Sequence, residues 1–372
     1  MVKKRILVVM DGFFPGEKFG GPPVSVNNFC SLMSEYEVYI VTKDHDLNSA
    51  ERYESITDGW NERENCYVKY LSDSDYGIDA FRKIVNEVKP DFIYLQSLFQ
   101  SCVLPCLIIA KRENIRAILA PRGELCKGAF RKKYKKIPYI ICLRLFGLVK
   151  NVCFQSTCDE ESEAIMKYLG AKNNNVHLLT NIPSCVNADF PYKVKESGSA
   201  KFIFLSRIHP KKNLLGAISF FKNIKGNVTF DIYGPIEDVG YWHECENIIK
   251  TLPDNIKVNY RGLITHDKTH STFNKYDAFV FPTFSENFGH VIAEALSSKC
   301  PVIISDQTPW NDVSEHKAGF SFSLDDTCGF TNAIQSIVDS DNAEMSENAK
   351  EFINSKYNFS QLKKEYTSLF TL

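Results

Sequence analysis

The chain has 372 residues, of which 44% are hydrophobic and 24% charged, with a net charge of −1 and a pI of about 6.7. This length suits two domains, and the composition is that of a globular protein. The near-neutral charge argues against a general nucleic-acid binder, which usually has a basic balance, so we expect no nucleic-acid partner.

The amino terminus and the cysteines bear on localisation. The start, MVKKRILVVMDG, runs from charged residues directly into a short apolar segment without a small-residue cleavage site, which predicts that it is not a signal peptide. No apolar run approaches the roughly 20 residues that span a bilayer. The 12 cysteines include no Cys-x2-Cys pair, so we interpret them as buried free thiols rather than zinc ligands. These features predict a cytoplasmic protein.

Short apolar runs alternate with helical patterns through the first half of the chain. The runs predict strands at residues 5–10, 38–42, 66–71, 91–96, 117–120, 151–157 and 176–180. Helical patterns occur at 24–36, 78–88, 102–112 and 160–169. Repeated strand–helix units imply a doubly wound parallel sheet, because right-handed crossovers place helices on both of its faces.

Two loops of this half follow predicted strands and carry candidate ligand contacts. Gly20 and Gly21 end the loop DGFFPGEKFGGPP just before a helix, so their amides can meet a phosphate; a simple flexible turn is the alternative. Arg122 lies in the later loop APRGEL. It is a candidate ligand contact, and a loop arginine paired with Glu124 is the alternative interpretation.

The segment from Lys127 to Lys150, KGAFRKKYKKIPYIICLRLFGLVK, has the most unusual composition in the chain. A dense basic run that includes Phe130 and Tyr134 leads into about a dozen mostly apolar residues, too few to cross a membrane. Three interpretations are open. The segment is a solvated basic face leading into a core helix, a membrane-surface attachment through cations and aromatics, or a nucleic-acid contact, for which no motif is present.

Residues 185–200 contain proline and polar residues without periodicity, which predicts a linker between a first domain, 1–184, and a second domain, 201–357. The alternation then resumes. Strands are predicted at 201–205, 228–233, 256–260, 277–281 and 301–306, and helices at 328–338, 343–354 and 360–370.

Two cations follow the first strand of the second domain, in the sequence SRIHPKKNL. Arg207 and Lys212 lie on the loop that leads into a helix beginning near Asn213. A guanidinium can grip phosphate oxygens as a fork and an ammonium adds a compact charge, so this pair beside a helix start predicts a polyanion site. Ordinary surface cations are the alternative.

The stretch FPTFSENFGHVIAEAL, residues 281–296, passes from strand through turn to helix without a spacer. A helix that follows a parallel strand in this way aims its free amides and the positive end of its dipole at a ligand. The amides in question belong to Asn287, Phe288, Gly289 and His290.

Two carboxylates bracket this turn. Glu286 precedes the helix, where a capping acid is the alternative interpretation. Glu294 lies within the helix among apolar neighbours, so its side chain is expected to point into the protein. A buried carboxylate needs a partner, and either ligand hydroxyls or a buried arginine would satisfy it.

The two acids with the Phe-Gly turn, SENFG..IAEAL, form a Glu-x7-Glu signature that resembles the retaining glycosyltransferases of bacterial family 4, the glycogen-synthase-like group. The resemblance implies an α/β fold of the GT-B type, with two Rossmann-like doubly wound parallel-sheet domains facing an interdomain cleft. The first domain would bind the acceptor and the second the nucleotide sugar. Residues 358–372 would form a helix that crosses back to the first domain.

The resemblance also implies roles for candidate residues of the second domain. Arg207 and Lys212 match the family's Arg-x4-Lys diphosphate pair. Glu294 would hold the ribose hydroxyls, and Glu286 would hold the sugar hydroxyls as an essential residue.

Three further positions take their expected roles from the same resemblance. Gly262 and Leu263 match a turn that lies against the nucleobase, with a tight connection as the alternative. The loop of Gly20 and Gly21 matches one that faces the donor. Arg122 lies near a place where many relatives have a histidine that contacts the sugar, and this departure leaves its role open.

The function implied is a retaining, metal-independent transfer of a hexose or N-acetylhexosamine from a UDP- or GDP-linked donor, with no other cofactor, to a glycan or lipid-linked acceptor. Lipopolysaccharide, capsule or exopolysaccharide biosynthesis would be the setting. Because many relatives extend lipid-linked glycans at the inner membrane face, the resemblance favours the membrane interpretation of residues 127–150 over the nucleic-acid one. The alternatives are a sugar-nucleotide epimerase on a similar fold and a non-catalytic protein that binds nucleotide sugars or glycans.

Overall fold

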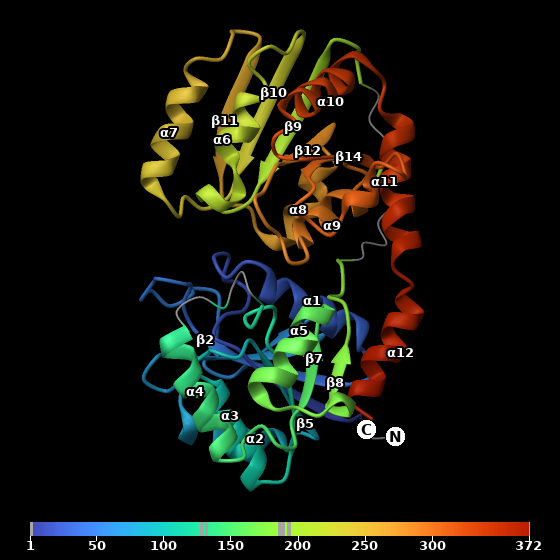
Figure 1. Cartoon of the computed structure of the whole chain (residues 1–372). Helices are drawn as coiled ribbons and strands as arrows, with labels where there is room; N and C mark the ends of the chain where they lie inside the picture. Colours follow the sequence, from blue (N-terminus) through green and yellow to red (C-terminus); the bar gives the residue numbers. More distant parts are fainter. Residues whose placement is uncertain (1–2, 127–129, 131–132, 185–189, 192–194, 372) are drawn as a thin grey trace. The chain divides into compact units, whose positions relative to one another are not determined.

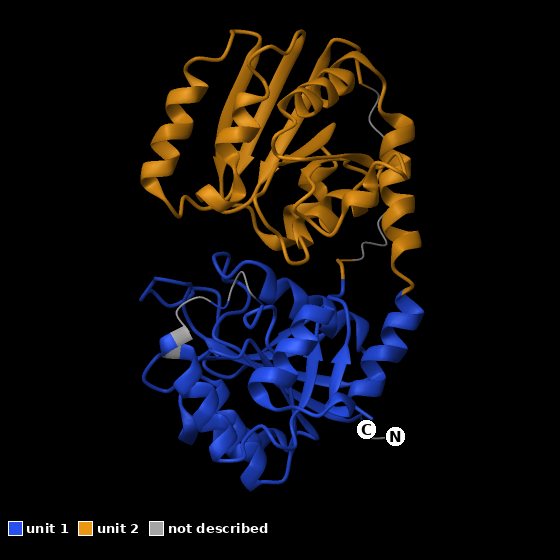
Figure 2. Ribbon diagram, in the orientation of Figure 1, with its two compact units in different colours: residues 1–182, 359–372 blue, residues 183–358 orange. Residues whose placement is uncertain are grey.

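The structure is a computed structural model that describes residues 3–126, 130, 133–184, 190–191 and 195–371. The chain forms two compact units, each built on one sheet (Figure 1). Unit 1 comprises residues 1–182 together with 359–372, and unit 2 comprises residues 183–358 (Figure 2). Parts of the predicted linker, 185–189 and 192–194, lie outside the described residues.

Unit 1 has an eight-stranded sheet in the order β3-β4-β2-β1-β5-β6-β7-β8. Neighbouring strands are parallel except β3 and β4, which pair antiparallel. The strands are β1 (Arg5–Val9), β2 (Glu37–Lys43), β3 (Trp60–Arg63), β4 (Cys66–Leu71), β5 (Phe92–Gln96), β6 (Arg116–Ala120), β7 (Cys153–Ser156) and β8 (Val176–Leu178). The sequence did not predict β3, because its four residues, WNER, show no apolar alternation.

Helices cover both faces of this sheet. They are α1 (Gly21–Leu32), α2 (Ile78–Val88), α3 (Val103–Arg112), α4 (Lys133–Leu145), α5 (Asp159–Ala164), which continues as a π-helical turn, and α12 (Phe359–Leu369). Leu7 faces the core shared with α2 and α3, whereas the next residue, Val8, faces the core shared with α1 and α12. Successive side chains of a strand point to opposite faces, so burial on both sides makes β1 a continuous apolar run.

The start of α1 corrects the predicted boundary. The helix begins at Gly21 rather than near Val24, and it includes Pro22 and Pro23 in its first turn. Proline is tolerated there because the first amides of a helix have no partner inside it. The prolines therefore open the helix instead of extending the loop.

Unit 2 has a six-stranded parallel sheet in the order β11-β10-β9-β12-β13-β14. Its strands are β9 (Ser199–Leu205), β10 (Asn227–Tyr233), β11 (Ile256–Gly262), β12 (Ala278–Phe281), β13 (Val302–Ser305) and β14 (Gly319–Phe322). Its helices are α6 (Leu214–Ser219), α7 (Val239–Ile249), α8 (His266–Phe273), α9 (His290–Ser297), α10 (Thr327–Asp339) and α11 (Ala343–Lys356). The sequence did not predict β14, whose residues GFSF form a run too short to stand out.

The strand order of unit 2 reverses between β9 and β12, which lie side by side with Ala278 opposite Phe202. In open α/β sheets, ligands bind outside the carboxyl ends of the strands at such a switch point. The fold thus singles out the loops that follow β9 and β12.

Within the described part of the chain, no helix is both long enough and apolar enough to cross a membrane. Of the segment from Lys127 to Lys150, residues 127–129 and 131–132 lie outside the described residues, and α4 occupies much of the remainder.

Candidate functional site

The loops after β9 and β12 are joined to each other at the carboxyl edge of the unit 2 sheet. The amide of Phe284 donates to the carbonyl of Lys211 over 2.9 Å, and the hydroxyl of Thr283 donates to the same carbonyl over 3.2 Å. The side-chain amide of Asn213 donates to the carbonyl of Pro282 over 2.9 Å. These bonds hold the segment that carries Lys212 against the segment that carries Glu286.

Lys212 and Glu286 form an ion pair across this junction, the two side chains being only 11% and 17% exposed. Burial lowers the pKa of Lys212 from its ordinary value, and the charge of Glu286 opposes that effect. The sequence predicted both residues as site residues but not their contact. A close ion pair of this kind fixes both side chains at the carboxyl edge of the sheet.

Arg207 lies beside this pair, on the same loop as Lys212. Its guanidinium donates to both carboxylate oxygens of Glu237, at 2.8 and 3.1 Å, and its charge adds to the lowering of the pKa of Lys212. The Arg207 and Glu237 side chains are 39% and 36% exposed. An ion pair this exposed contributes about 0–1 kcal/mol, so the guanidinium can exchange Glu237 for a phosphate at little cost.

Gly234 allows the loops after β9 and β10 to approach closely. Its φ is 131°, and a Cβ added there would lie 1.9 Å from the carbonyl oxygen of Ser206. The amide of Ile208 in turn donates to the carbonyl of Pro235 over 2.9 Å. Only glycine permits this contact, which positions Arg207.

The turn into α9 carries the four residues whose amides the sequence predicts as a ligand site. Gly289 caps the helix in the left-handed conformation, with φ 78° and ψ 58°. The helix then begins at His290, and in its first turn the amides of Ile292 and Ala293 donate to the carbonyl of Gly289 over 2.9 and 3.3 Å. Asn287 is exposed. The backbone amide of Glu286, just before it, donates to the carbonyl of Gln307 over 3.1 Å.

The side chain of Phe288 packs in the core of unit 2. The ring is 7% exposed and lies 5.7 Å from the ring of Trp310, measured between centroids. The indole of Trp310 donates to the carbonyl of Phe288. Trp310 is fully buried, and its hydrogen bond fixes the backbone of the turn at Phe288.

Glu294 points into the protein as predicted, but no buried arginine pairs with it among the described residues. Its side chain is 6% exposed, its Oε1 accepts no hydrogen bond from the described part of the chain, and Nδ1 of His266 lies 3.7 Å from that oxygen. Burial raises the pKa of Glu294 to about 8. A buried carboxyl oxygen without a hydrogen bond is costly unless a ligand supplies one.

The turn after β11 includes the other two candidates of unit 2. Gly262 has a φ of 76°, and no atom lies within 4 Å of a Cβ built on it. Its carbonyl accepts from the amide of Gly234 over 2.9 Å. Leu263 is 49% exposed, an unusual position for a leucine beside a polar edge.

Three candidates belong to unit 1. Gly20, with φ 72°, caps α1, and Gly21 is its first residue. The alternative interpretation, a loop arginine paired with Glu124, is wrong, because Arg122 and Glu124 have other partners. The carboxylate of Glu124 instead accepts from the hydroxyl of Ser97 over 2.7 Å and from the backbone amides of Leu98 and Phe99, which follow Ser97.

Arg122 is bound within a polar network of unit 1. Its guanidinium donates to Gln96 over 2.8 Å, to the hydroxyl of Tyr94 over 3.3 Å and to the side chain of Asn181. Tyr94 donates onward to Gln155. These hydrogen bonds hold the guanidinium of Arg122 within unit 1, so no ligand contact is needed to explain its position.

Sequence reasoning missed two residues that contact the site. Glu237 follows the Gly-Pro turn after β10, and the only signal was an acid near the end of a strand on the candidate edge. His266 is the first residue of α8, four positions after Gly262, in a helix that the sequence did not predict.

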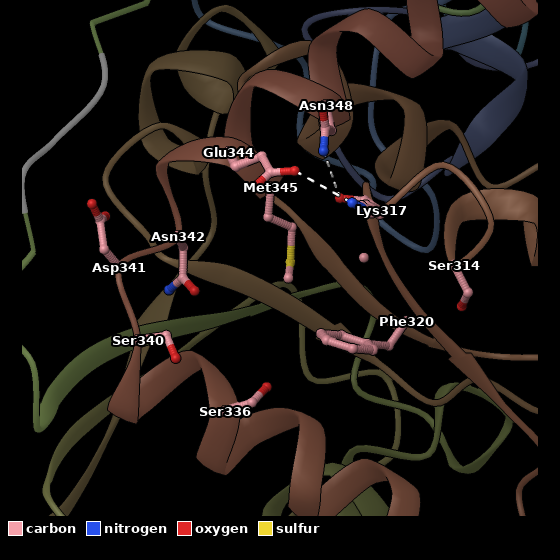
Figure 3. A pocket seen from close by; sticks show the side chains of 11 residues that line it. Ser314, Lys317, Phe320, Ser336, Ser340, Asp341, Asn342, Glu344, Met345 and Asn348 are labelled. Carbon is pink, nitrogen blue, oxygen red and sulfur yellow. Dashed lines mark hydrogen bonds and ion pairs between the residues drawn. The ribbon is translucent and has the colours of Figure 1, made fainter.

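A pocket of about 350 Å³ lies at the opposite end of the unit 2 sheet, beside the start of β14 (Figure 3). Phe320 and Met345 contribute apolar surface, and Lys317 pairs with Glu344 over 3.5 Å. The buried amide of Asn342 donates to a backbone carbonyl of α10. Of the described residues, those lining the pocket include no candidate site residue, so we assign it no part in the site.

Residues 187–353 match the family model described as "Glycosyl transferases group 1". This range contains all the candidate residues of unit 2. The chain is also 28% identical over 127 residues to the "Processive diacylglycerol alpha-glucosyltransferase" of Acholeplasma laidlawii; the match spans 34% of this chain and 37% of the length of that enzyme.

Several solved structures are similar over almost the whole chain. HepE of Anabaena in complex with UDP and glucose has a TM-score of 0.71 at 14% identity, covering 98% of each chain. Sucrose-phosphate synthase of Thermosynechococcus elongatus has a TM-score of 0.66 at 14% identity, covering 99% of this chain and 98% of the other. WaaG, a glycosyltransferase involved in lipopolysaccharide biosynthesis, has a TM-score of 0.64 at 10% identity, covering 98% and 99%.

At these identities the likeness shows the fold alone. The prediction of an α/β fold with two parallel-sheet domains is confirmed, and this fold matches solved glycosyltransferase structures of the GT-B type.

Proposed function

We propose that the chain is a retaining glycosyltransferase that moves a hexose or N-acetylhexosamine from a nucleotide-diphosphate sugar to a glycan or lipid-linked acceptor. The observation that carries the proposal is the group of Arg207, Lys212, Glu286 and the start of α9 at the switch point of the unit 2 sheet. The family match over residues 187–353 supports it independently.

The cations are suited to the leaving group of this reaction. As the bond between the sugar and the diphosphate breaks, negative charge builds on the phosphate oxygens. Fixed cations and helix amides lower the barrier most where such charge develops. Arg207 and Lys212 would bind the diphosphate together with the amides that open α9, so the reaction would need no divalent metal.

The two carboxylates would hold the rest of the donor. Glu294 offers a buried oxygen without a hydrogen bond, which suits a pair of ribose hydroxyls. Glu286, held by Lys212, would accept hydroxyls of the transferred sugar. Gly262 and the exposed Leu263 would lie against the nucleobase. UDP is the first nucleotide to test because HepE was solved with it, and GDP is the second.

The chemistry would preserve the anomeric configuration. The anomeric carbon loses its bond to the phosphate oxygen and gains a bond to the acceptor oxygen on the same face, and the proton of the acceptor hydroxyl passes to the departing phosphate. Glu286 would position the sugar in this step without forming a bond to it. We propose that the reaction belongs to the assembly of a lipopolysaccharide, capsule or exopolysaccharide and takes place in the cytoplasm.

Incubation with UDP- and GDP-sugars, with and without glycan or lipid-linked acceptors, tests the proposal. We expect release of nucleoside diphosphate that requires an acceptor, and a product whose anomeric configuration by NMR equals that of the donor. Release without an acceptor, together with an altered free sugar, would indicate an epimerase. Binding without turnover of any donor and acceptor pair would indicate a non-catalytic binding protein.

A further inference from the structure

Helices α8 and α9 pack side by side in unit 2 (Figure 1) and are joined by a stripe of polar side chains. On α8 the stripe consists of His266 and His270, which are four residues apart and so lie on one face of the helix. On α9 it consists of Glu294 and, directly after the helix, Ser298. Nδ1 of His266 lies 3.7 Å from Oε1 of Glu294, and Nδ1 of His270 lies 2.9 Å from Oγ of Ser298. The stripe thus begins at a residue of the candidate site and continues one helical turn further to Ser298.

The inner end of the stripe is buried and reaches the first residues of unit 2. Ser298 is fully buried, and Ser184, the second residue of unit 2, is 7% exposed. The other ring nitrogen of His270, Nε2, lies 2.9 Å from the hydroxyl oxygen of Ser184. Ser297 adds a second contact, because its hydroxyl donates to the carbonyl of Ser184 over 3.1 Å. His270 therefore lies between α9 and the segment by which the chain enters unit 2.

The hydrogen bonds of Ser298 determine which nitrogen of His270 carries the proton. The hydroxyl of Ser298 donates its one proton to the backbone carbonyl of Glu294 over 2.7 Å, because a carbonyl can only accept. Ser298 must therefore accept from His270, which places the proton of the ring on Nδ1. In a neutral imidazole the other nitrogen is an acceptor, so Nε2 accepts from the hydroxyl of Ser184. Each donor of this network then has an acceptor.

The surroundings of His270 favour the neutral ring that this network needs. Burial, and after it the charge of His266, lowers the pKa of His270 to about 4, although the carbonyl of Glu294 opposes the shift. A neutral ring keeps one donor and one acceptor, whereas a protonated ring would donate from both nitrogens and leave the hydroxyl of Ser184 without its acceptor. A buried polar network whose members are all satisfied makes the elements that it joins rigid.

We propose that His270 is a positioning residue for the donor: through Ser298 it holds α9 against α8, so that the carboxyl group of Glu294 stays fixed beside His266. Glu294 depends on such support because its buried Oε1 accepts no hydrogen bond from the described part of the chain. The inference rests on the proposed function, in which Glu294 binds the ribose hydroxyls. A residue that touches no ligand would in this way set how strongly the site prefers a ribose to a sugar without these hydroxyls.

Two substitutions of His270 separate its two hydrogen bonds. The side-chain amide of asparagine reaches the position of Nδ1, whereas that of glutamine reaches the position of Nε2. His270→Asn can therefore keep the bond to Ser298, and His270→Gln can keep only the bond to Ser184. Ser298→Ala removes the contact with α9 from its other side and should behave like His270→Gln.

Calorimetric titration with two ligands measures the effect. The ligands are UDP or GDP, whichever the wild type binds, and the 2′,3′-dideoxy analogue of that nucleotide. We expect the wild type to bind the ribose form at least about tenfold more tightly than the analogue. His270→Gln and Ser298→Ala should lower this ratio below about threefold, whereas His270→Asn should keep it.

The controls distinguish positioning from a general loss of structure. His243→Gln alters an exposed histidine on α7 of the same unit and should keep the wild-type ratio. A variant that is merely less stable would bind both ligands more weakly and leave their ratio unchanged, and thermal unfolding without ligand shows whether each variant is folded. Nitrogen NMR of the His270 ring should show the proton on Nδ1 and no titration between about pH 6 and 8.

The outcomes also separate this inference from the proposed function. If the wild type prefers the ribose form, an unchanged ratio in His270→Gln and Ser298→Ala, an equal loss in His270→Asn, or a ring proton on Nε2 would overturn the role of His270 alone. Wild-type binding without that preference would contradict the role of Glu294, and the inference would fall with it. A wild type that binds neither nucleotide would overturn the proposed function as well.

Discussion

At the scale of single residues, the site depends on how buried charges are paired. Burial lowers the pKa of Lys212, and the charge of Glu286 against it opposes that shift. The sequence predicted both residues from their place after parallel strands, β9 and β12. It could not predict their contact, which depends on these two strands being neighbours in the sheet. The contact of Arg207 with Glu237 could not be predicted either, because β9 and β10 are adjacent in the sheet but separated in sequence by a helix, and Glu237 itself was missed.

Glu286→Gln should separate binding from turnover. The variant keeps the shape of the side chain but cannot balance the charge of Lys212 or hold sugar hydroxyls as a carboxylate does. We expect kcat to fall at least about 100-fold while the Kd for the nucleoside diphosphate changes by no more than about threefold. Steady-state kinetics and calorimetry measure the two quantities.

The control for this variant is Asp306→Asn, which removes one negative charge from an exposed position on the same sheet edge. It should leave kcat and Kd within about twofold of the wild type. Full activity of Glu286→Gln would exclude an essential role for that carboxylate.

Glu294 should make the stability of the protein depend on pH. Glutamates of an unfolded chain ionise near pH 4.3, whereas burial raises the pKa of folded Glu294 to about 8. Between these values the folded state retains a proton that the unfolded state has lost, so the free energy of unfolding falls as the pH rises. Glu294→Gln removes this effect and should gain stability relative to the wild type as the pH rises.

Urea unfolding of the wild type and Glu294→Gln at pH 5.5 and 7.5 measures that effect. The stability of the variant minus that of the wild type should be larger at pH 7.5, by up to about 3 kcal/mol. The variant should also bind nucleotide more weakly, because the amide presents one acceptor oxygen and an NH2 group where the carboxyl group presents two oxygens to the ribose hydroxyls. An equal difference at both pH values would show that Glu294 is already ionised in the folded protein.

At the scale of elements, most strands and the helices at the end of the chain could be predicted, because buried parallel strands read as continuous apolar runs. The elements that were missed had no such signal. Strand β3 is polar and pairs antiparallel at an edge, and α7 and α8 expose much of their surface. The turns between elements were identified as candidate sites by glycine and proline, although their conformations required the structure.

Two glycines of the unit 2 edge give a matched test of these turns. Both have positive φ, but only Gly234 has a backbone atom in the way of a Cβ, whereas Gly262 has open space. Gly262→Ala should cost about 1–2 kcal/mol of stability from conformational strain alone. Gly234→Ala should cost about 3 kcal/mol or more, because the backbone at Ser206 must move.

Urea unfolding compares the two variants, and calorimetry should show that Gly234→Ala also weakens binding of the nucleoside diphosphate, since the displaced loop carries Arg207. Equal costs for the two substitutions would mean that the loops after β9 and β10 are not held in close contact.

At the scale of the whole molecule, the sequence predicted two α/β domains and the last helix, but not the contacts that complete unit 1. The hydroxyl of Tyr366 on α12 donates to the carbonyl of Thr180 over 2.9 Å, and its ring lies 6.0 Å from that of Phe29, between centroids. Such contacts join segments far apart in the chain and leave no local pattern. The network that holds Arg122 escaped prediction for the same reason, since its members come from separate strands and loops.

The central claim is that a diphosphate is bound by Arg207, Lys212 and the start of α9. The most direct test is calorimetric titration with the nucleoside diphosphate that binds best and with its parent nucleoside, using the wild type, Arg207→Ala, Lys212→Ala and the neighbouring exposed-lysine control Lys211→Ala. We predict that the diphosphate loses at least about tenfold in affinity for the first two variants only, while nucleoside binding is unchanged. Equal losses for nucleoside and diphosphate, or no loss for either, would contradict the account.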